Sequence, residues 1–363
     1  MMKPNLKINQ STINQDAECY VIAEIGCNHQ GDIEKAKSII TKAKQAGANA
    51  VKLQKRSNKE LFTQSMYDMP YINENSFGKT YGEHREFLEL NKSEYIELQQ
   101  HATDLDITLF ATPFDFQSVD FLADLNMPAY KIASGDITNI PLIEYVANLG
   151  KPLLISTGWA TLTDVKRAYD TIMPINPNLC ILQCTSSYPA EPEDMNLNVI
   201  KTYIDNFKDI IIGLSDHQNG IAMALVGYVL GARVIEKHFT INRGWKGTDQ
   251  AFSLEYAGLE KLVRDLQRAK SAMGDGIKSL TEKEKNPIFK LGKKIVAAKT
   301  IEAGSIITRN DIAIKSPGDG LAPYNLNYII GKNATKTFSK DEDIELIHIK
   351  WLNHGTQPIF NKK

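Results

Sequence analysis

This 363-residue sequence has few cysteines, no charge imbalance and no long apolar run. Its four cysteines, Cys19, Cys27, Cys180 and Cys184, have spacings that fit no zinc motif, and a chain of this length needs no disulfide framework. We therefore expect reduced thiols in a cytoplasmic protein. No stretch approaches the roughly 20 apolar residues of a membrane span. The polar start MMKPNLKINQ lacks the apolar run of a signal peptide, so we expect no membrane partner.

Charge is balanced, with 42 Lys and Arg against 43 Asp and Glu. A nucleic-acid-binding surface needs a basic excess, so we expect no nucleic-acid partner. The balance still allows a local basic pocket for a small phosphorylated ligand. A hydrophobic fraction of 42% indicates a folded globular protein, and the length suits one large domain and one small domain.

Short apolar runs alternate with segments of helical periodicity over residues 20–273. The runs are almost continuously apolar, which is typical of strands buried on both faces in a parallel sheet. We predict eight strands, at Tyr20–Gly26, Ala50–Gln54, Thr108–Pro113, Ala129–Ser134, Pro152–Gly158, Cys180–Ser186, Ile210–His217 and Arg233–Phe239. We predict eight helices, at Asp32–Ala46, Ser93–Asp104, Asp115–Leu125, Pro141–Leu149, Thr163–Met173, Asn196–Phe207, Asn219–Leu230 and Leu254–Met273.

Eight alternating strands and helices over about 250 residues predict an α/β fold, a TIM (β/α)8 barrel. A doubly wound open sheet is the alternative. The strand count and the lack of G-x-G-x-x-G after the first strand favour the barrel.

Composition divides the chain into a barrel domain (1–273), a polar linker (274–290), a small β-rich domain (291–352) and a tail (353–363). In the small domain, short β-rich runs alternate with turn residues, and a last strand is expected at Asp343–Trp351. Residues 55–92 form a long insertion after the second strand. Its aromatic and basic residues favour an ordered lid over a flexible loop.

Polar side chains end every predicted strand. The active site of a TIM barrel lies where strands end and βα loops begin, so these side chains should share one rim. They are Glu24, Lys52, Gln54, Thr112, Lys131, Ser134, Asp136, Ser156, Ser186, Tyr188, Ser215, Asp216, His217 and His238.

His217 and His238 end the last two strands, which are neighbours in a closed barrel. Imidazoles that converge there can bind a divalent metal ion and leave positions open for a substrate carbonyl. The alternative is one surface histidine and one buried structural histidine. We predict metal ligation, because the other rim residues point to a functional site.

Lys52 and Lys131 emerge from buried strands, where an ammonium group needs an anionic partner or a lowered pKa. With the surrounding hydroxyls they form a candidate cradle for a phosphorylated acid, although a single serine at a strand end often only caps a helix. Lys131 has a rival role as a Schiff-base lysine, which the histidine pair argues against.

Glu24 is a candidate general acid or base, with a salt bridge to Lys52 as the structural alternative. Asp249 follows the last strand and is a candidate for binding a substrate hydroxyl, with helix capping as the alternative.

Nine barrel motifs together resemble the sialic acid synthase family: VIAEIGCNHQGD, VKLQK, ATPFD, YKIASGD, ISTG, LQCTSSYP, IGLSDH, EKHFT and KGTDQAFSLE. The stretches IEAGSIITRNDI, KSPGDG and IIGKNATKTF resemble the antifreeze-like (SAF) domain of that family. The resemblance runs from about Tyr20 to Trp351 in the order of the family.

The resemblance implies condensation of phosphoenolpyruvate with an open-chain N-acetylmannosamine-type sugar and release of phosphate. A divalent ion (Mn²⁺ or Mg²⁺) on His217 and His238 would activate the aldehyde. The resemblance also implies a domain-swapped homodimer. The residues that the resemblance implies for binding phosphoenolpyruvate are Lys52, Thr112, Lys131, Ser134, Ser156, Ser186 and Ser215. Those that it implies for binding the sugar or transferring protons are Glu24, Gln54, Tyr188 and Asp249. The predicted catalytic residues are Glu24, Lys52, Lys131 and Asp136.

Three positions depart from the bacterial pattern: Asp136 replaces Glu, Ser186 replaces Asn and Ser316 replaces an Arg. GKTYGEHREFLEL and GDITN look closer to the animal branch, which uses the sugar 6-phosphate, and Lys79, Arg85 and Lys246 are candidates to bind that phosphate. The alternatives are a synthase of a related nonulosonic acid (legionaminic, pseudaminic or deaminated) and a non-catalytic sugar-binding barrel.

Overall fold

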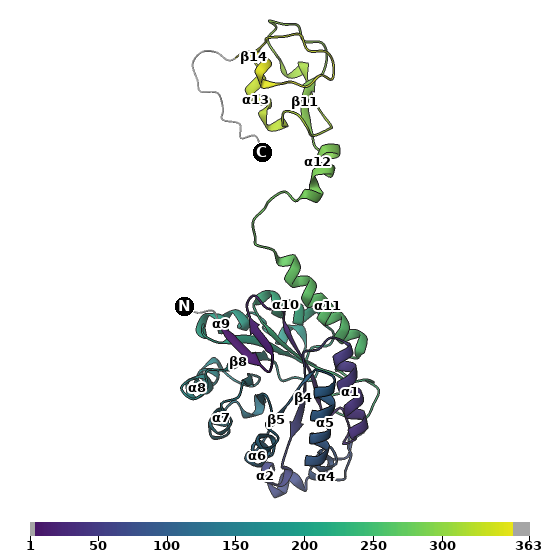
Figure 1. Ribbon diagram of the computed structural model, residues 1–363, viewed down its shortest axis with the longest axis vertical. Coiled ribbons are helices and arrows are strands. Elements are labelled where there is room, and N and C mark those ends of the chain that lie inside the picture. Colours follow the sequence, from purple (N-terminus) through teal and green to yellow (C-terminus); the bar gives the residue numbers. More distant parts are fainter. Residues whose placement is uncertain (1–3, 351–363) are drawn as a thin grey trace. The chain divides into compact units, whose positions relative to one another are not determined.

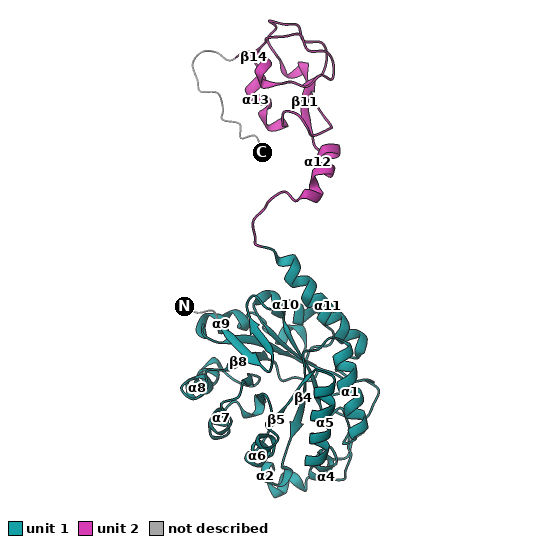
Figure 2. Ribbon diagram, viewed as in Figure 1, with its two compact units in different colours: residues 1–274 teal, residues 275–363 magenta. Residues whose placement is uncertain are grey.

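A computed structural model gives the structure of this protein and describes residues 4–350. The chain divides into two compact units, residues 1–274 and residues 275–363 (Figure 2). Each unit has its own buried core, so each is described by itself.

Eight parallel strands close into a barrel in the order β10-β3-β4-β5-β6-β7-β8-β9, which confirms the predicted TIM barrel. Closure is made by β10 pairing with both β3 and β9. The strands are β3 (Tyr20–Gly26), β4 (Ala50–Lys55), β5 (Thr108–Pro113), β6 (Tyr130–Ile132), β7 (Leu153–Ser156), β8 (Leu179–Cys184), β9 (Ile211–Asp216) and β10 (Val234–His238).

Helices follow the strands and lie outside the barrel (Figure 1). Their starts are set by side chains that cap free backbone N–H groups, such as Asp32 before α1 and Asn91 before α5. The helices are α1 (Ile33–Gln45), α5 (Lys92–Asp104), α6 (Phe116–Asp124), α7 (Ile140–Ala147), α8 (Leu162–Ile172), α9 (Val199–Asn206), α10 (Ala222–Leu230) and α11 (Tyr256–Met273), with 3₁₀ turns η1 (Ser134–Asp136) and η2 (Pro192–Asp194).

Successive residues of each barrel strand belong to two different cores, as the two-residue period of a strand requires. One set packs under the helices and includes Val21, Val51 and Leu109. The other set fills the barrel interior near the start of the strands: Tyr20, Ile22, Ala50, Phe110, Ala129, Leu154, Cys180, Leu182, Ile211 and Val234.

A short hairpin closes the N-terminal end of the barrel. It pairs β1 (Asn5–Ile8) with β2 (Ser11–Asn14) and was not among the predicted strands. Leu6, Ile8 and Ile13 are buried in the interior cluster of the barrel. The hairpin therefore seals the end opposite to the predicted active site.

The insertion at residues 55–92 is ordered, in agreement with the expected lid. It contains α2 (Asn58–Leu61), α3 (Gln64–Tyr67) and α4 (Tyr81–Phe87). His84 lies at its centre, with ring centroids 4.7 Å from Tyr71 and 5.8 Å from Phe77. These aromatic contacts give the segment a core of its own.

The second unit is small and rich in short strands, as expected. The predicted linker contains helical segments, η3 (Glu282–Glu284) and α12 (Lys285–Leu291). The rest comprises β11 (Lys294–Ala297), η4 (Arg309–Asp311), β12 (Ile312–Lys315), η5 (Pro323–Asn325), α13 (Leu326–Ile329), β13 (Asn333–Ala334), η6 (Leu346–His348) and β14 (Ile349–Lys350). The predicted last strand is thus a 3₁₀ turn and a two-residue strand; its end at Trp351 and the predicted tail lie outside the described residues.

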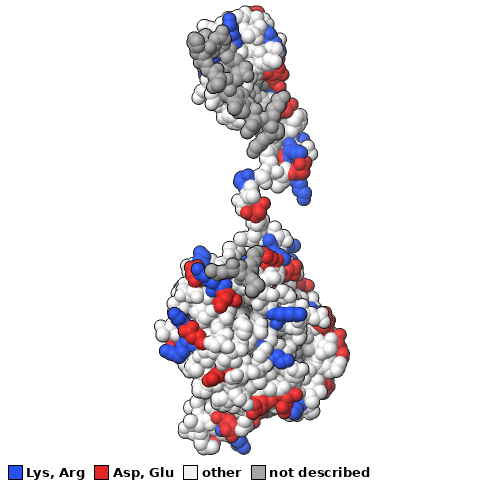
Figure 3. All heavy atoms as spheres, turned by 60° about the vertical axis from the view of Figure 1, so that its left-hand side comes forward, with Lys and Arg blue, Asp and Glu red and all other residues white. Residues whose placement is uncertain are grey.

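Basic and acidic side chains are interspersed on the barrel face shown in Figure 3. Within residues 4–350, no helix has the length and apolar character needed to cross a membrane.

Candidate active site

A cavity of about 400 Å³ opens at the C-terminal ends of the barrel strands. This volume lies in the usual range for a small-molecule site. The cavity brings together nearly all the predicted site residues, although they come from every part of the barrel sequence. Its lining includes Glu24, Lys52, Gln54, Thr112, Lys131, Ser134, Ser156, Ser186, Tyr188, Ser215, His217, His238 and Asp249.

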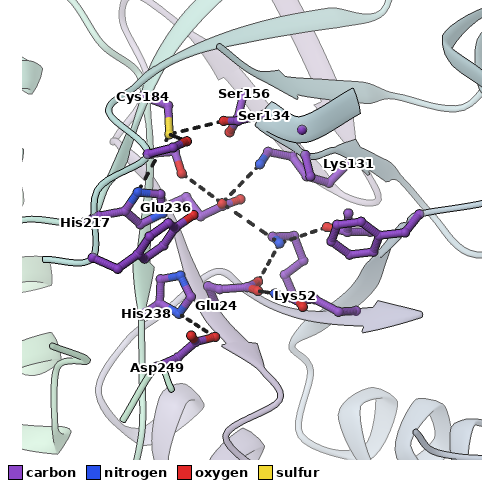
Figure 4. Close-up of a pocket in the computed structure, with 18 of the residues that line it drawn as sticks. Glu24, Lys52, Lys131, Ser134, Ser156, Cys184, His217, Glu236, His238 and Asp249 are labelled. Atoms are coloured by element: carbon purple, nitrogen blue, oxygen red, sulfur yellow. Dashed lines mark hydrogen bonds and ion pairs between the residues drawn. The ribbon is translucent and has the colours of Figure 1, made fainter. Parts of the chain in front are cut away.

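Four buried charged groups form a chain across the floor of the cavity (Figure 4). Lys52 Nζ lies 2.6 Å from Glu24 Oε2 and 3.9 Å from Glu236 Oε1. Lys131 Nζ lies 3.2 Å from the same Glu236 oxygen. Two cations and two carboxylates thus balance each other without solvent. The salt bridge considered as the alternative role of Glu24 is therefore present.

Burial and mutual attraction set the pKa values of this cluster. Burial raises the pKa of Glu24, and Lys52 opposes that rise. Burial would also raise the pKa of Glu236, but Lys131 and Lys52 outweigh it and lower the value to about 2. Burial lowers the pKa of Lys131. The environment therefore gives the two carboxyl groups different pKa values, and Glu24 is the more easily protonated of the two.

Glu236 is a site residue that the sequence analysis missed. It lies on β10 two positions before His238, so both point to the barrel interior while Lys237 points away. Lys237 is instead paired with Asp216 at 2.8 Å. Its position two residues before His238 was the sequence signal that could have identified it as a residue of the barrel interior.

Hydroxyl groups surround the charged cluster. Lys52 donates to Thr112 Oγ1 at 2.9 Å, and Ser215 donates to Glu236 at 3.1 Å. Ser156 Oγ is buried and has no hydrogen-bond partner among residues 4–350. An unpartnered hydroxyl in a cavity that also holds two lysines is a group that an incoming phosphate or carboxylate would satisfy.

Gly158 is needed beside these hydroxyls. Its N–H donates to Ser134 Oγ at 3.0 Å. A β-carbon at this position would lie 2.0 Å from Ser186 Oγ and 2.8 Å from Ser134 Oγ. Any larger residue would push into the space between the two serines.

His217 and His238 face each other across one wall of the cavity, with ring centroids 5.4 Å apart. Nδ1 of His217 lies 2.9 Å from the carbonyl oxygen of Thr185, an arrangement in which Nδ1 donates and Nε2 is left for a ligand. Burial lowers the pKa of His217, but Cys184 Sγ, 3.8 Å from the same nitrogen, together with the Thr185 carbonyl and the Glu236 charge, outweighs burial and raises the pKa.

His238 is buried, and burial lowers its pKa to about 3. Its Nδ1 has no hydrogen-bond partner in the described part of the chain; Asp249 Oδ2 lies 3.8 Å away. A neutral imidazole with an unsatisfied nitrogen is suited to bind a metal ion. Within residues 4–350, no set of three or more His, Cys, Asp or Glu side chains is placed to hold a metal, so an ion on the histidine pair would need further ligands.

Gln54 connects the charged cluster to the outer part of the cavity. Its Nε2 donates to Glu24 at 2.7 Å, and its Oε1 accepts from Arg56 at 2.6 Å. Gly26 lies against them: a β-carbon there would be 3.0 Å from Glu24, 3.1 Å from Gln54 and 3.5 Å from Asp249. The positive φ of Gly26 and the shift in strand register after Glu24 let these side chains converge.

Aromatic and sulfur groups complete the walls. The Tyr188 ring packs on His217 with centroids 4.2 Å apart, and Phe252 packs on His238 at 4.9 Å. Cys184 lies 3.8 Å from Ser186 Oγ and 3.5 Å from Ser134 Oγ. Burial opposes ionisation of this thiol, but His217 outweighs it and lowers the pKa to about 7.

One predicted catalytic residue does not reach the cavity. Asp136 ends the turn η1 and is not among the lining residues, and its Oδ1 accepts from Asn139 Nδ2 at 3.1 Å. The side chain thus supports the turn before α7. The 3₁₀ turn, which the sequence pattern did not reveal, points Ser134 and Gly135 at the cavity instead.

The three residues predicted as candidates to bind a sugar phosphate do not all lie in the cavity. Arg85 lines the cavity, whereas Lys79 and Lys246 do not. Lys246 instead lies over the Phe77 ring at 4.7 Å. Arg56, Trp159 and Phe114 line the cavity without having been predicted.

Comparisons with known proteins agree with this geometry. The NeuB family model matches residues 39–278, and the SAF domain model matches residues 294–345. The chain is 41% identical to N-acetylneuraminate-9-phosphate synthase of Homo sapiens, over 93% of this chain and 94% of the human protein. It is 36% identical to N,N'-diacetyllegionaminic acid synthase of Campylobacter jejuni, over 89% and 97% of the two chains.

Among solved structures, the fold is similar to the N-acetylneuraminic acid (sialic acid) synthetase of Leptospira borgpetersenii, with a TM-score of 0.69 and 31% identity over 79% of this chain and 96% of that one. The barrel, its cavity, the second unit and these matches lead to one conclusion: the chain belongs to the NeuB family, the sialic acid synthases, and carries a SAF domain.

Proposed function

We propose that this protein is a carbon–carbon bond-forming transferase that condenses phosphoenolpyruvate with an open-chain N-acetylmannosamine-type sugar, giving a sialic acid and phosphate. The observation that carries the proposal is the buried chain of Glu24, Lys52, Glu236 and Lys131 beside the two facing histidines. The similar human and Leptospira proteins are named as synthases of N-acetylneuraminate 9-phosphate and of N-acetylneuraminic acid, which supports a product of this class.

Phosphoenolpyruvate would bind over Lys52 and Lys131. Both ammonium groups are buried, and the hydroxyls of Thr112, Ser156 and Ser215 lie around them. An anion arriving here gains charge-assisted hydrogen bonds and satisfies Ser156 Oγ, which has no partner in the described protein. Ser134 and Ser186 lie on the same side of the cavity, on either side of Gly158.

The reaction balances as follows. The methylene carbon of phosphoenolpyruvate bonds to the aldehyde carbon of the sugar, whose oxygen takes a proton and becomes a hydroxyl. Water adds to the carbon that carries the phosphate ester and loses one proton. The new hydroxyl then loses its second proton and becomes the ketone as the carbon–oxygen bond to the phosphate breaks, and the phosphate leaves with the electron pair of that bond and takes up a proton. Glu24 is placed to move one of these protons, because its raised pKa brings the carboxyl closer to neutral pH.

A divalent ion, Mn²⁺ or Mg²⁺, fits the histidine pair. His217 keeps Nε2 available and His238 has an unsatisfied Nδ1. Bound there, the ion would act as a Lewis acid on the sugar aldehyde. Glu24, Gln54, Tyr188 and Asp249 would position the sugar beside it.

Phosphate release with phosphoenolpyruvate and a panel of acceptors tests the proposal. The panel holds N-acetylmannosamine, its 6-phosphate, mannose 6-phosphate and a 2,4-diacetamido sugar, each with and without Mn²⁺. Turnover with none of them would refute the synthase. Turnover with the diacetamido sugar alone would favour a legionaminic acid synthase, to which the chain is also similar.

The metal site needs its own test. Calorimetric titration of the metal-stripped protein with Mn²⁺ should show one site, and His217→Ala with His238→Ala should remove it. Retained activity in that double variant would exclude the metal role and leave the rest of the proposal standing. The domain-swapped homodimer stays a prediction, which sedimentation of the full chain can check.

A further inference from the structure

A buried ion pair lies beside the two facing histidines in sequence, on the other side of their strands. Asp216 is the last residue of β9 and Lys237 directly precedes His238 on β10, and the two are aligned in the strand pairing. Because successive side chains of a strand alternate, both point away from the cavity that His217 and His238 line. Neither residue has a role in the proposed reaction so far.

The pair is shielded from solvent and bonded to the backbone. Lys237 Nζ donates to Asp216 Oδ2 at 2.8 Å, and the two side chains are 1% and 0% exposed. Both also bond to Gln218: Asp216 Oδ1 accepts from its N–H at 2.9 Å, and Lys237 Nζ donates to its carbonyl oxygen. The ion pair therefore holds the backbone directly before and directly after His217.

His217 needs this support because it lies just beyond the end of β9. The pairing of β9 with β10 ends at Asp216, so the strand ladder does not extend to the histidine. The carbonyl oxygen of His217 accepts from Ala190 N at 3.1 Å, a contact with the loop that follows β8. Lys237 instead belongs to the strand that carries His238. It therefore ties the segment that holds one histidine to the strand that holds the other.

Stability alone does not account for this ion pair. Taking two charges out of water has a high free-energy cost, and an apolar pair of similar volume is often as stable or more stable. An ion pair with directed hydrogen bonds sets distances and angles, which apolar contacts do not. Groups that orient metal-binding histidines commonly change metal affinity by about 10- to 100-fold. The position of the pair between two such histidines favours a role in geometry.

We propose that Asp216 and Lys237 are positioning residues that fix His217 and His238 relative to each other before a metal ion binds. An ion held by two imidazoles depends strongly on their separation, and a preformed arrangement lowers the free-energy cost of binding. The inference rests on the metal role in the proposed function, since it names the residues that set the geometry of that site.

The test removes both charges but keeps the packing. Asp216→Val with Lys237→Met eliminates the bonds to Gln218 and leaves no unpaired charge, so the urea midpoint should stay close to that of the wild type. The Kd for Mn²⁺, from calorimetric titration of the metal-stripped full chain, should rise by about 10- to 100-fold. Lys55→Met with Glu89→Gln removes another lysine–carboxylate pair at a strand end and is the matched control, whose Kd should stay within about threefold.

A second measurement needs no metal. Gln218 N–H loses its acceptor in the double variant of Asp216 and Lys237, so hydrogen exchange should be faster in peptides that cover residues 214–221. Peptides that cover β6 and β7 should exchange as in the wild type. If the apolar pair folds poorly, Asp216→Asn with Lys237→Gln takes its place, because it is also neutral and its side chain at 237 is shorter than lysine.

Each outcome decides. If the wild type binds Mn²⁺ through the histidines, an unchanged Kd or unchanged exchange in the double variant would overturn the proposal. A urea midpoint as low as that of Lys237→Met alone would also overturn it, because the pair would then serve the stability of the fold. A wild type without histidine-dependent binding would refute the metal role, and the exchange comparison alone would then decide whether the ion pair holds His217 in place.

Discussion

The two ends of the barrel are built from the same strands but have opposite chemistry. On β10 the interior positions are Val234, then Glu236, then His238. On β4 they are Ala50, then Lys52, then Gln54. Interior residues at the start of the strands form a dry apolar cluster, and those at the end form a charged cavity.

The difference shows how a barrel separates stability from catalysis. The first interior layer is sealed by the hairpin β1–β2 and can gain only from tight packing. The last layer holds four buried charges that balance one another and leave Ser156, His238 and Glu236 with unsatisfied atoms. Substitutions at the closed end should therefore change folding, and those at the open end should change catalysis or the response to pH.

Lys131→Met should give the largest effect. It leaves Glu236 with only the more distant Lys52, so we expect a loss of about 3–5 kcal/mol in the free energy of unfolding. Phosphate release should fall by about 100- to 1000-fold, because a preorganised charge is lost from the site. Urea unfolding and the phosphate assay measure the two effects. Adding Glu236→Leu should restore stability but not activity. Recovery of activity in that double variant would show that the reaction does not need the buried charges of Lys131 and Glu236.

Phe110→Ala tests the closed end. Its ring is fully buried in the interior cluster, and its removal should cost about 3–5 kcal/mol. Below the lowered melting temperature kcat/KM should be unchanged. Phe116→Ala, on the exposed side of α6, is the control and should cost less than about 1 kcal/mol. A large change in KM for Phe110→Ala would show that the two ends are not independent.

His29 is buried in the loop between β3 and α1, at the open end of the barrel, and His29→Gln should remove a pH dependence of stability. Burial lowers the pKa of His29 from 6.5 to about 4, so the folded protein holds the ring neutral while the unfolded chain protonates it. Stability should therefore fall by about 3 kcal/mol as the pH drops from 6.5 to 4. Gln can still accept the hydrogen bond from Gly31 N, and its urea midpoint should vary less over this range. If the urea midpoints of the two proteins changed with pH in parallel, His29 would not be the source of this pH dependence.

Ser156→Ala should give the smallest and most selective effect. Its hydroxyl has no partner within the described residues, so unfolding free energy should stay within about 0.5 kcal/mol. The KM for phosphoenolpyruvate should rise by about 10-fold, because the ligand loses one hydrogen bond to a charged group. An unchanged KM would place phosphoenolpyruvate elsewhere.

The sequence predicted the barrel well because buried parallel strands and amphipathic helices have distinct periods. Most of the predicted site residues also line one cavity, because every strand end such as Thr112 or Ser215 falls on the same rim. The hairpin β1–β2 was missed because its strands are four residues long and half exposed, too short to show a period.

Other differences between prediction and structure came from geometry that residue spacing does not encode. Asp136 follows the polar residues of β6, but a 3₁₀ turn directs it to Asn139. Glu236 was not predicted because it lies two residues before the end of β10, and the prediction used only the residues at strand ends. The burial of Arg56 could not be predicted, since it depends on Phe114, which directly follows the neighbouring strand β5.

The sealed end of the barrel also has a kinetic consequence. Because side chains fill the barrel interior and the hairpin β1–β2 covers its other end, every ligand must enter and leave by the same mouth. The group that binds deepest, against Lys52 and Lys131, must arrive before the sugar fills the outer part. We therefore expect ordered binding, with phosphoenolpyruvate first. At high concentrations of the acceptor sugar, the acceptor should inhibit competitively against phosphoenolpyruvate. The hairpin would in this way help to set the order in which the two substrates bind.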